Sequence, residues 1–299
     1  MTADVHERDA RRRRRRFRRL LLLGTLAAVG FAVVVANLDF ILGDPEQRAI
    51  AAERAKRRSL WLIGNALPGT PDLGRLSERL SERGFTLSQP ILVRIFKREF
   101  ELEIWKERGG RLHHFSTYPI CRWSGRLGPK FQTGDRQAPE GFYAVGSGAL
   151  NPASRWRRSF NLGFPNAFDR AHGRTGSYLM VHGGCSSVGC YAMTDAVIDE
   201  IWHLVTAALA GGQRRFQVQA FPFRMTAENL AAKEGHPNHA FWSSLKAGSD
   251  LFEASGLPPL TRVCGGEYVF LPGRRVLDGA SPPLAQCPEG KGRDPRPQS

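Results

Sequence analysis

The sequence predicts a mainly β domain with flanking helices, an α+β fold. Apolar and polar residues alternate over 91–96 and again over 100–104, which is the pattern of strands with one buried face. Two glycines at 109–110 then lead into a third candidate strand over 112–120. Because the breaks between these runs are short, we expect the three strands to pair as antiparallel hairpins.

Two helices and four further strands follow from the same kind of pattern. Leucines at helical spacing predict a short amphipathic helix over 72–83, which Gly84 ends. An apolar-periodic segment predicts a longer helix over 196–210, for which Thr194 or Asp195 is the candidate N-terminal cap. Short apolar runs predict strands at 141–145, 178–182, 216–221 and 268–270.

Composition changes along the chain and predicts its division into segments. The region 151–176 is rich in glycines and aromatic residues but has little periodicity, so we expect loops that form a groove. We expect a cytoplasmic arginine-rich tail (1–19), a transmembrane anchor or signal segment (20–38), a helical linker (39–86), a β-rich central domain (87–221), a helical C-terminal extension (222–280) and a disordered tail (281–299).

The net charge of +15 is concentrated near the N-terminus, where nine arginines precede residue 20. The next 19 residues, 20–38, carry no charge and are nearly long enough to span a bilayer. Arginines on the N-terminal side predict that this end stays in the cytoplasm. We therefore expect a single-pass protein of the cell inner membrane with its main domain in the periplasm, or a periplasmic protein if the chain is cleaved near Ala36. Such export argues against a nucleic-acid partner.

Five cysteines in an exported protein leave one thiol unpaired if the others form two bridges. Our candidate for the unpaired thiol is Cys190. Cys264 and Cys287 lie in a Gly/Pro-rich region and can pair. Cys121 and Cys185 either pair or stay buried and reduced, and the sequence leaves this open.

The most informative stretch is 177–195, where His182 precedes Cys190 by eight positions and glycines surround both. A thiol between a strand-terminal imidazole and glycine-freed backbone N–H groups has the parts of an acyl-transferring cysteine enzyme: a nucleophile, a base and oxyanion donors. The alternatives are a buried structural thiol, which the flanking glycines disfavour, and a zinc site with Cys185, which lacks a clear fourth ligand. We therefore expect no metal and no cofactor.

At these residues the chain resembles a known family. The S-x-G-C motif at 187–190 follows V-H-G at 181–183, a long matching run covers 160–195, and the segment 138–143 matches as well, with a looser similarity from about 71 to 268. This combination is similar to the L,D-transpeptidase (YkuD-type) catalytic domain, and most of all to its YafK-like subgroup. The resemblance implies a β-sandwich catalytic domain with the cysteine at the base of a groove.

The resemblance also implies an activity on peptidoglycan stem peptides. Cys190 is expected to attack the carbonyl at the L-centre of a diamino acid and form a thioester, with His182 as general base and acid and the Gly189 N–H as an oxyanion donor. The YafK-like subgroup implies a hydrolytic outcome overall, which would release protein linked to the wall, including wall-attached outer-membrane protein. The alternatives are transpeptidation, which forms 3–3 cross-links or attaches protein, and a non-catalytic peptidoglycan-binding scaffold.

The second ring nitrogen of His182 needs a partner that fixes the tautomer. The candidates are a backbone carbonyl at Gly183 or Gly184, or the hydroxyl of Ser187, which otherwise orients the loop.

Two departures from the family pattern bear on substrate binding. Val188 stands where many members carry histidine, and Ala192 stands where many carry an arginine suited to a substrate carboxylate. Arg174 is our candidate for the missing cation, although a solvent-facing or turn-stabilising role is the alternative. The other candidate substrate-binding residues, each with a structural alternative as a packing or turn residue, are Tyr191, Asn166 and His172.

Overall fold

The computed structural model describes residues 24–25, 30, 44–285 and 287. Contacts divide the chain into two units, 1–52 and 53–299, and each is considered by itself. The first described helix, α3 (Pro45–Leu62), crosses the boundary between the two units. Every other helix and strand named below belongs to the second unit.

The predicted membrane segment needs correction. Residues 20–38 lie outside the described part of the chain except for 24, 25 and 30, and so do the tails 1–19 and 288–299. Among the described residues, no helix combines the length and the apolar character needed to cross a bilayer. The longest, α3, carries seven charged side chains, which are costly in hydrocarbon. The structure therefore does not support the predicted single-pass inner-membrane location.

The first sheet contains the strands that the sequence analysis predicted as hairpins. Its order is β3-β2-β1-β10-β5, in which β1 and β10 are parallel and the other neighbours are antiparallel. The predicted antiparallel pairing of the first three strands is confirmed. The strands are β1 (Ile91–Phe96), β2 (Glu101–Arg108), β3 (Arg111–Pro119), β5 (Gly141–Gly146) and β10 (Arg215–Phe221).

The second sheet has very short strands in the order β4-β9-β8-β7-β6. Its only parallel pair is β8 with β9, in which Val181 lies opposite Tyr191 and His182 opposite Ala192. This register brings the residue that ends β8 beside the residues that begin β9. The strands are β4 (Arg122–Trp123), β6 (Leu150–Asn151), β7 (Ser159–Asn161), β8 (Met180–His182) and β9 (Tyr191–Ala192).

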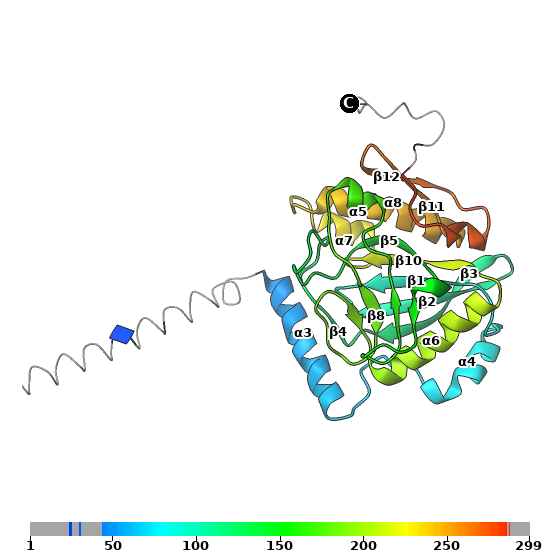
Figure 1. The fold of residues 1–299 in the computed structure, drawn as a ribbon, viewed down its shortest axis with the longest axis horizontal. Coiled ribbons are helices and arrows are strands. Elements are labelled where there is room, and N and C mark those ends of the chain that lie inside the picture. Colours follow the sequence, from blue (N-terminus) through cyan, green and yellow to red (C-terminus); the bar gives the residue numbers. More distant parts are fainter. Residues whose placement is uncertain (1–23, 26–29, 31–43, 286, 288–299) are drawn as a thin grey trace, which may run out of the picture. The chain divides into compact units, whose positions relative to one another are not determined.

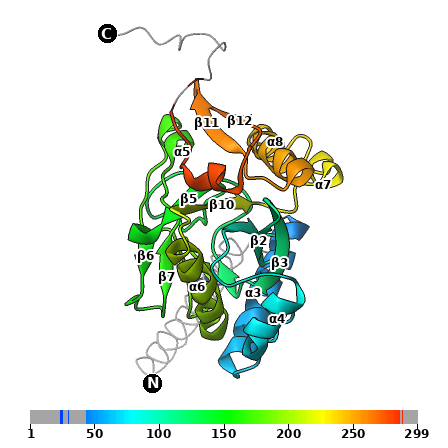
Figure 2. The ribbon, with the colours of Figure 1, turned by 90° about the vertical axis from the view of Figure 1, so that its right-hand side faces the viewer.

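Helices and a hairpin cover the ends of the unit. Figures 1 and 2 show α8, α7 and the β11–β12 hairpin gathered at one end, with α6 and α4 towards the other. These elements are η1 (Leu73–Arg75), α4 (Leu76–Glu82), η2 (Ser147–Ala149), α5 (Ala167–Ala171), α6 (Asp195–Ala210), α7 (Ala227–Ala231), α8 (His239–Ser255), β11 (Leu260–Cys264), β12 (Glu267–Leu271) and η3 (Val276–Ala280). The predicted helix over 196–210 is confirmed as α6, and its cap is Thr194, whose hydroxyl accepts from the Val197 N–H.

The two larger sheets contact each other through aromatic side chains. Phe160 on β7 meets Phe216 on β10 edge-on, with ring centroids 5.7 Å apart, and both rings are fully buried. The fold is therefore a mixed α+β arrangement with two sheets and several helices, which agrees with the predicted β-rich domain. The predicted limits of the linker, the central domain and the extension stay predictions.

Candidate active site

His182 and Cys190 line one cavity of about 360 Å³. The loop between them connects β8 to β9, and the parallel pairing of these strands brings both ends of the loop together. Cys185 takes a positive φ of 42° within this loop, a backbone conformation that a non-glycine residue rarely adopts. The cavity is also lined by Ser154, Arg155, Trp156, Ser159, Tyr178, Met180, Ser186 and Val188.

Cys190 is the free thiol of the chain. The other four cysteines form two disulfides, Cys121–Cys185 and Cys264–Cys287, so both pairings that the sequence left open are present. Cys190 is partly exposed. A reagent or a substrate therefore meets a single cysteine in this protein.

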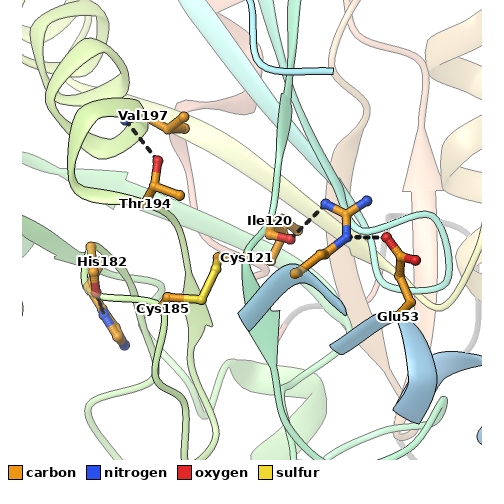
Figure 3. Close-up of a disulfide and its surroundings, with 9 residues drawn as sticks. Glu53, Ile120, Cys121, His182, Cys185, Thr194 and Val197 are labelled. Carbon is orange, nitrogen blue, oxygen red and sulfur yellow. Dashed lines mark hydrogen bonds and ion pairs between the residues drawn. A yellow bond between two sulfur atoms is a disulfide. The ribbon is translucent and has the colours of Figure 1, made fainter. Parts of the chain in front are cut away.

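The Cys121–Cys185 bridge fixes the loop that carries the candidate site. Figure 3 shows this bridge close to His182. The Cys121 N–H donates to the Ala192 carbonyl at 2.8 Å, and the Met193 N–H donates to the His182 carbonyl at 2.7 Å. Next to the bridge in the sequence, the Ile120 carbonyl accepts from the Arg57 guanidinium at 3.0 Å. These bonds leave the loop little freedom to reorient.

His182 is buried and its tautomer is fixed. Its Nδ1 lies 2.5 Å from the Gly183 carbonyl oxygen, which can only accept, so Nδ1 carries the proton and Nε2 is left as a proton acceptor. Trp156 stacks over the ring, with centroids 6.2 Å apart. Burial lowers the pKa of His182 below its ordinary value, although the bond to Gly183 acts in the opposite sense. The imidazole is therefore neutral at neutral pH and able to act as a base.

The Cys190 thiol is neutral too. Burial raises the pKa of Cys190 above its ordinary value, and two effects oppose this: the Met180 N–H, which donates to Sγ at 3.4 Å, and the charge of Lys130. The thiol itself points to the Tyr178 carbonyl at 3.7 Å. The resting site therefore holds a neutral thiol and a neutral imidazole in one cavity. Proton transfer then belongs to the attack on a substrate rather than to the resting state.

The amides expected to donate to an oxyanion already have partners. The Gly189 N–H donates to the Ser124 hydroxyl at 2.5 Å, and the Cys190 N–H donates to the Ser187 hydroxyl at 3.0 Å. Ser187 in turn donates to the Cys190 carbonyl at 2.7 Å. Ser187 therefore holds the loop, and the partner of His182 is the Gly183 carbonyl instead. A substrate oxygen would have to replace these hydroxyl contacts.

Arg174 and Asn166 lie away from the thiol cavity. Arg174 is buried and pairs with Asp169 at 2.8 Å, between aromatic rings. Asn166 caps α5 by accepting from the Asp169 N–H, and it donates to the Phe142 carbonyl at 2.8 Å. The Arg174–Asp169 pair and the Asn166 side chain hold α5 against its neighbours, although Arg174 Nε has no hydrogen-bond partner within the described residues. Asn166 also lines a neighbouring cavity.

Tyr191 and His172 are also outside this cavity. Tyr191 is fully buried, and its hydroxyl donates to the Pro139 carbonyl at 2.6 Å. The His172 Nδ1 lies 2.9 Å from the Phe168 carbonyl at the end of α5, and its ring packs against the Phe168 ring. The structure thus brings together His182, Cys190, Gly183, Gly189 and Ser187, but not the four candidate substrate-binding residues.

The sequence analysis missed Trp156 and Tyr178 as lining residues. Tyr178 was placed in a buried strand, whereas β8 begins at Met180 and the Tyr178 side chain is 76% exposed at a positive φ of 55°. Gly176, two residues earlier, was the available signal that the strand begins later. Trp156 lies in the glycine-rich region for which a groove was expected, but no pattern there distinguishes it from other aromatic residues. Within the described residues, no cluster of three or more His, Cys, Asp or Glu is placed to hold a metal.

A free cysteine and a tautomer-fixed histidine on neighbouring strand ends of an α+β fold define a candidate cysteine acyl-transfer site. Two relatives from Escherichia coli, strain K12 and O157:H7, both named "Putative L,D-transpeptidase YafK", are each 43% identical to this chain over 208 residues. The match covers 70% of this chain and 82% of each relative. The chain belongs to the L,D-transpeptidase family that includes YafK.

Other comparisons add less. No family model matches the chain. Two solved structures have a weak similarity to part of this chain: the helical cell shape determining protein Pgp2 from Campylobacter jejuni and Bd1075 from Bdellovibrio bacteriovorus. Pgp2 is 20% identical with a TM-score of 0.37, covering 58% of this chain and 65% of Pgp2. Bd1075 is 16% identical with a TM-score of 0.33, covering 56% of this chain and 62% of Bd1075. At these TM-scores the similarity supports no conclusion about the fold or function of this chain.

Proposed function

We propose that this protein is a cysteine-dependent enzyme that acts on peptidoglycan stem peptides. Cys190 attacks the carbonyl at the L-centre of a diamino acid, the wall-linked protein leaves as the amine when the thioester forms, and water then hydrolyses the thioester to free the stem peptide. One observation carries the proposal: the chain's single free thiol shares a cavity with a histidine whose Nε2 is the remaining proton acceptor. The family supports the class of substrate.

The first half-reaction needs only these two side chains. His182 Nε2 takes the thiol proton as Cys190 Sγ bonds to the carbonyl carbon, so the neutral pair becomes charged only during attack. When the tetrahedral intermediate collapses, the carbon–nitrogen bond breaks and the Nε2 proton passes to the departing amine. The product is a thioester on Cys190 and a neutral His182.

The second half-reaction reverses the roles. His182 Nε2 takes a proton from water as its oxygen bonds to the thioester carbon, and the proton returns to sulfur as the carbon–sulfur bond breaks. The stem peptide leaves with a new carboxyl group, and Cys190 is a thiol again. The Gly189 and Cys190 N–H groups serve the oxyanion in both halves once a substrate oxygen replaces the hydroxyls of Ser124 and Ser187.

Transfer to an amine is the second candidate, and the transpeptidase name of the relatives favours it. The chemistry is identical up to the thioester, and an acceptor amine then replaces water, giving 3–3 cross-links or newly attached protein. The scaffold alternative requires that the thiol be unreactive.

The test is to incubate the full chain with protein-linked and with cross-linked wall fragments and to identify the products by mass spectrometry. We expect liberated protein and a stem peptide that gains one water, and neither from Cys190→Ala. New 3–3 cross-links without liberated protein would show that the enzyme catalyses transfer to an amine instead of hydrolysis. Absence of any product, together with failure of iodoacetamide to label Cys190 in the wild-type chain, would leave only the scaffold.

A further inference from the structure

A second and larger cavity adjoins the one that holds the thiol. Its volume is about 730 Å³, and it shares Tyr178 and Met180 with the thiol cavity. These two residues also provide the backbone groups that touch Cys190 Sγ. A ligand can therefore extend from the sulfur across Tyr178 and Met180 into the larger space.

The charged side chains that line the larger cavity are all positive. Arg170 and Arg215 are the charged side chains among the described residues that line it, and no acidic side chain lines it. Neither arginine forms an ion pair within the described part of the chain. Two guanidinium groups without a carboxylate partner favour a ligand that carries its own carboxylates.

Both arginines are exposed, and each lies against a neighbouring part of the chain. Arg170 donates from Nη1 to the Pro165 carbonyl, which ties it to the start of α5. Arg215 lies along Gly146, where a β-carbon would come within 3.0 Å of the Arg215 Cγ. The absence of a side chain at Gly146 gives the arginine stem its place at the end of β5.

The C-terminal part of the chain closes one wall of this cavity. Residues 282–285 line it. The Val263 N–H donates to the Leu284 carbonyl at 2.8 Å, and the Cys264–Cys287 disulfide fixes the same segment three residues later. The wall is therefore built by hydrogen bonds and a covalent link rather than by a loose tail.

Under the proposed mechanism, the leaving group and the acyl part of a substrate occupy different cavities. His182 lines only the smaller cavity, and it must protonate the departing amine, so the leaving group occupies that side. The acyl part, which stays on the sulfur, extends over Tyr178 and Met180. Resting on the proposed function, we propose that the larger cavity binds the acyl-donor peptide through its free carboxylates, which pair with Arg170 and Arg215.

Binding to an inactive chain tests this without catalysis. The full chain with Cys190→Ala is titrated with a fluorescent stem tripeptide that ends in a diamino acid, either with free carboxylates or with carboxamides. Removing one arginine as Arg215→Gln or Arg170→Gln should weaken the carboxylate form about 10-fold, because a charge-assisted hydrogen bond is lost. The matched control Arg214→Gln, an exposed neighbour outside the cavity, should change binding less than about twofold.

The carboxamide peptide should bind the parent about 10-fold more weakly and respond to neither arginine variant. In the chain that retains Cys190, Arg215→Gln should raise KM and leave kcat within about twofold, as expected for lost ground-state binding. Equal affinity for both peptides, an equal loss in Arg214→Gln, or no binding at all would overturn the inference. The proposed function is tested separately, by measuring whether the wild-type chain releases products from wall fragments.

Discussion

A buried ion pair and a partly exposed candidate catalytic pair in this protein differ in how completely their hydrogen-bonding capacity is used. In the first, Lys97 pairs with Glu140 at 2.8 Å, and both side chains are fully buried. Three carbonyl oxygens also lie within 3.1 Å of Lys97 Nζ, and Glu140 accepts from the Gly128 N–H and the Trp242 indole. Every strong donor and acceptor of this pair has a partner.

The second pair, His182 and Cys190, leaves capacity unused. The imidazole uses Nδ1 only, and the sulfur has one amide at 3.4 Å and one carbonyl at 3.7 Å. Both groups are neutral because burial moves the pKa of each towards its uncharged form. The comparison teaches that a polar pair buried for stability has its bonds completed by the protein, whereas a reactive pair keeps an atom available for the substrate.

The largest expected effect comes from removing the free acceptor. His182→Gln keeps a polar side chain but has no basic nitrogen, so hydrolysis of wall fragments should fall by about 10²- to 10⁴-fold. Iodoacetamide should still label Cys190, and the melting temperature should stay close to that of the wild type. Hydrolysis within a few-fold of wild type would show that another group takes the thiol proton.

The next effect concerns the completed pair. Glu140→Gln leaves the buried Lys97 without its counter-charge and should reduce the free energy of unfolding by about 3–5 kcal/mol in urea titrations. The matched control Asp250→Asn breaks the exposed pair with Lys246 and should cost less than about 1 kcal/mol. Labelling of Cys190 per folded molecule should stay unchanged in both. Equal losses in the two variants would contradict the distinction between the pairs.

A smaller effect is expected at Gly183, whose carbonyl holds the His182 ring. At Gly183 a β-carbon would lie 2.6 Å from the Asp195 Oδ1 and 3.0 Å from the Ile198 side chain, so Gly183→Ala must displace the carbonyl that holds His182. We expect kcat to fall by about 10-fold, because a small misplacement of a catalytic group is costly. Gly74→Ala, where the nearest atom is 3.5 Å away, is the control and should leave kcat unchanged.

The smallest effect is on pH dependence. The pKa of His182 is below its ordinary 6.5, so the acid limb of kcat should have its midpoint below pH 6.5. By linkage, the unfolded chain takes up the proton first, so the stability contributed by neutral His182 is present above pH 6.5 and is lost as pH falls below it. Iodoacetamide labelling should rise with a midpoint above pH 9.0, because the pKa of Cys190 is raised. A labelling midpoint near 7 would instead show a preformed thiolate.

The sequence predicted the parts of the fold that have a long enough pattern. The strand over 91–96 has the predicted bounds, and α6 begins within one residue of the prediction. Strands β4, β6 and β9 have only two residues each, which is too short for an alternating pattern to be recognised. Their positions depend on tertiary pairing rather than on local sequence.

The candidate site was predictable only in part, for a related reason. His182 and Cys190 stand out because glycines and a strand place them, and the structure brings them to one cavity. Arg174 and Asn166 have residue types that suit a ligand as well as they suit an internal ion pair or a helix cap. Only the three-dimensional arrangement shows that Asp169 already occupies the Arg174 guanidinium.

The Cys121–Cys185 bridge has a consequence for how the protein is produced. Cys185 lies only five positions before Cys190, and four cysteines alone permit three pairings. A chain that joined Cys121 to Cys190 would have no free thiol at Cys190 and would be inactive under the proposed mechanism. Preparations made without an isomerase should therefore contain an inert fraction that lacks the Cys190 thiol, and titrating that thiol would count the competent molecules.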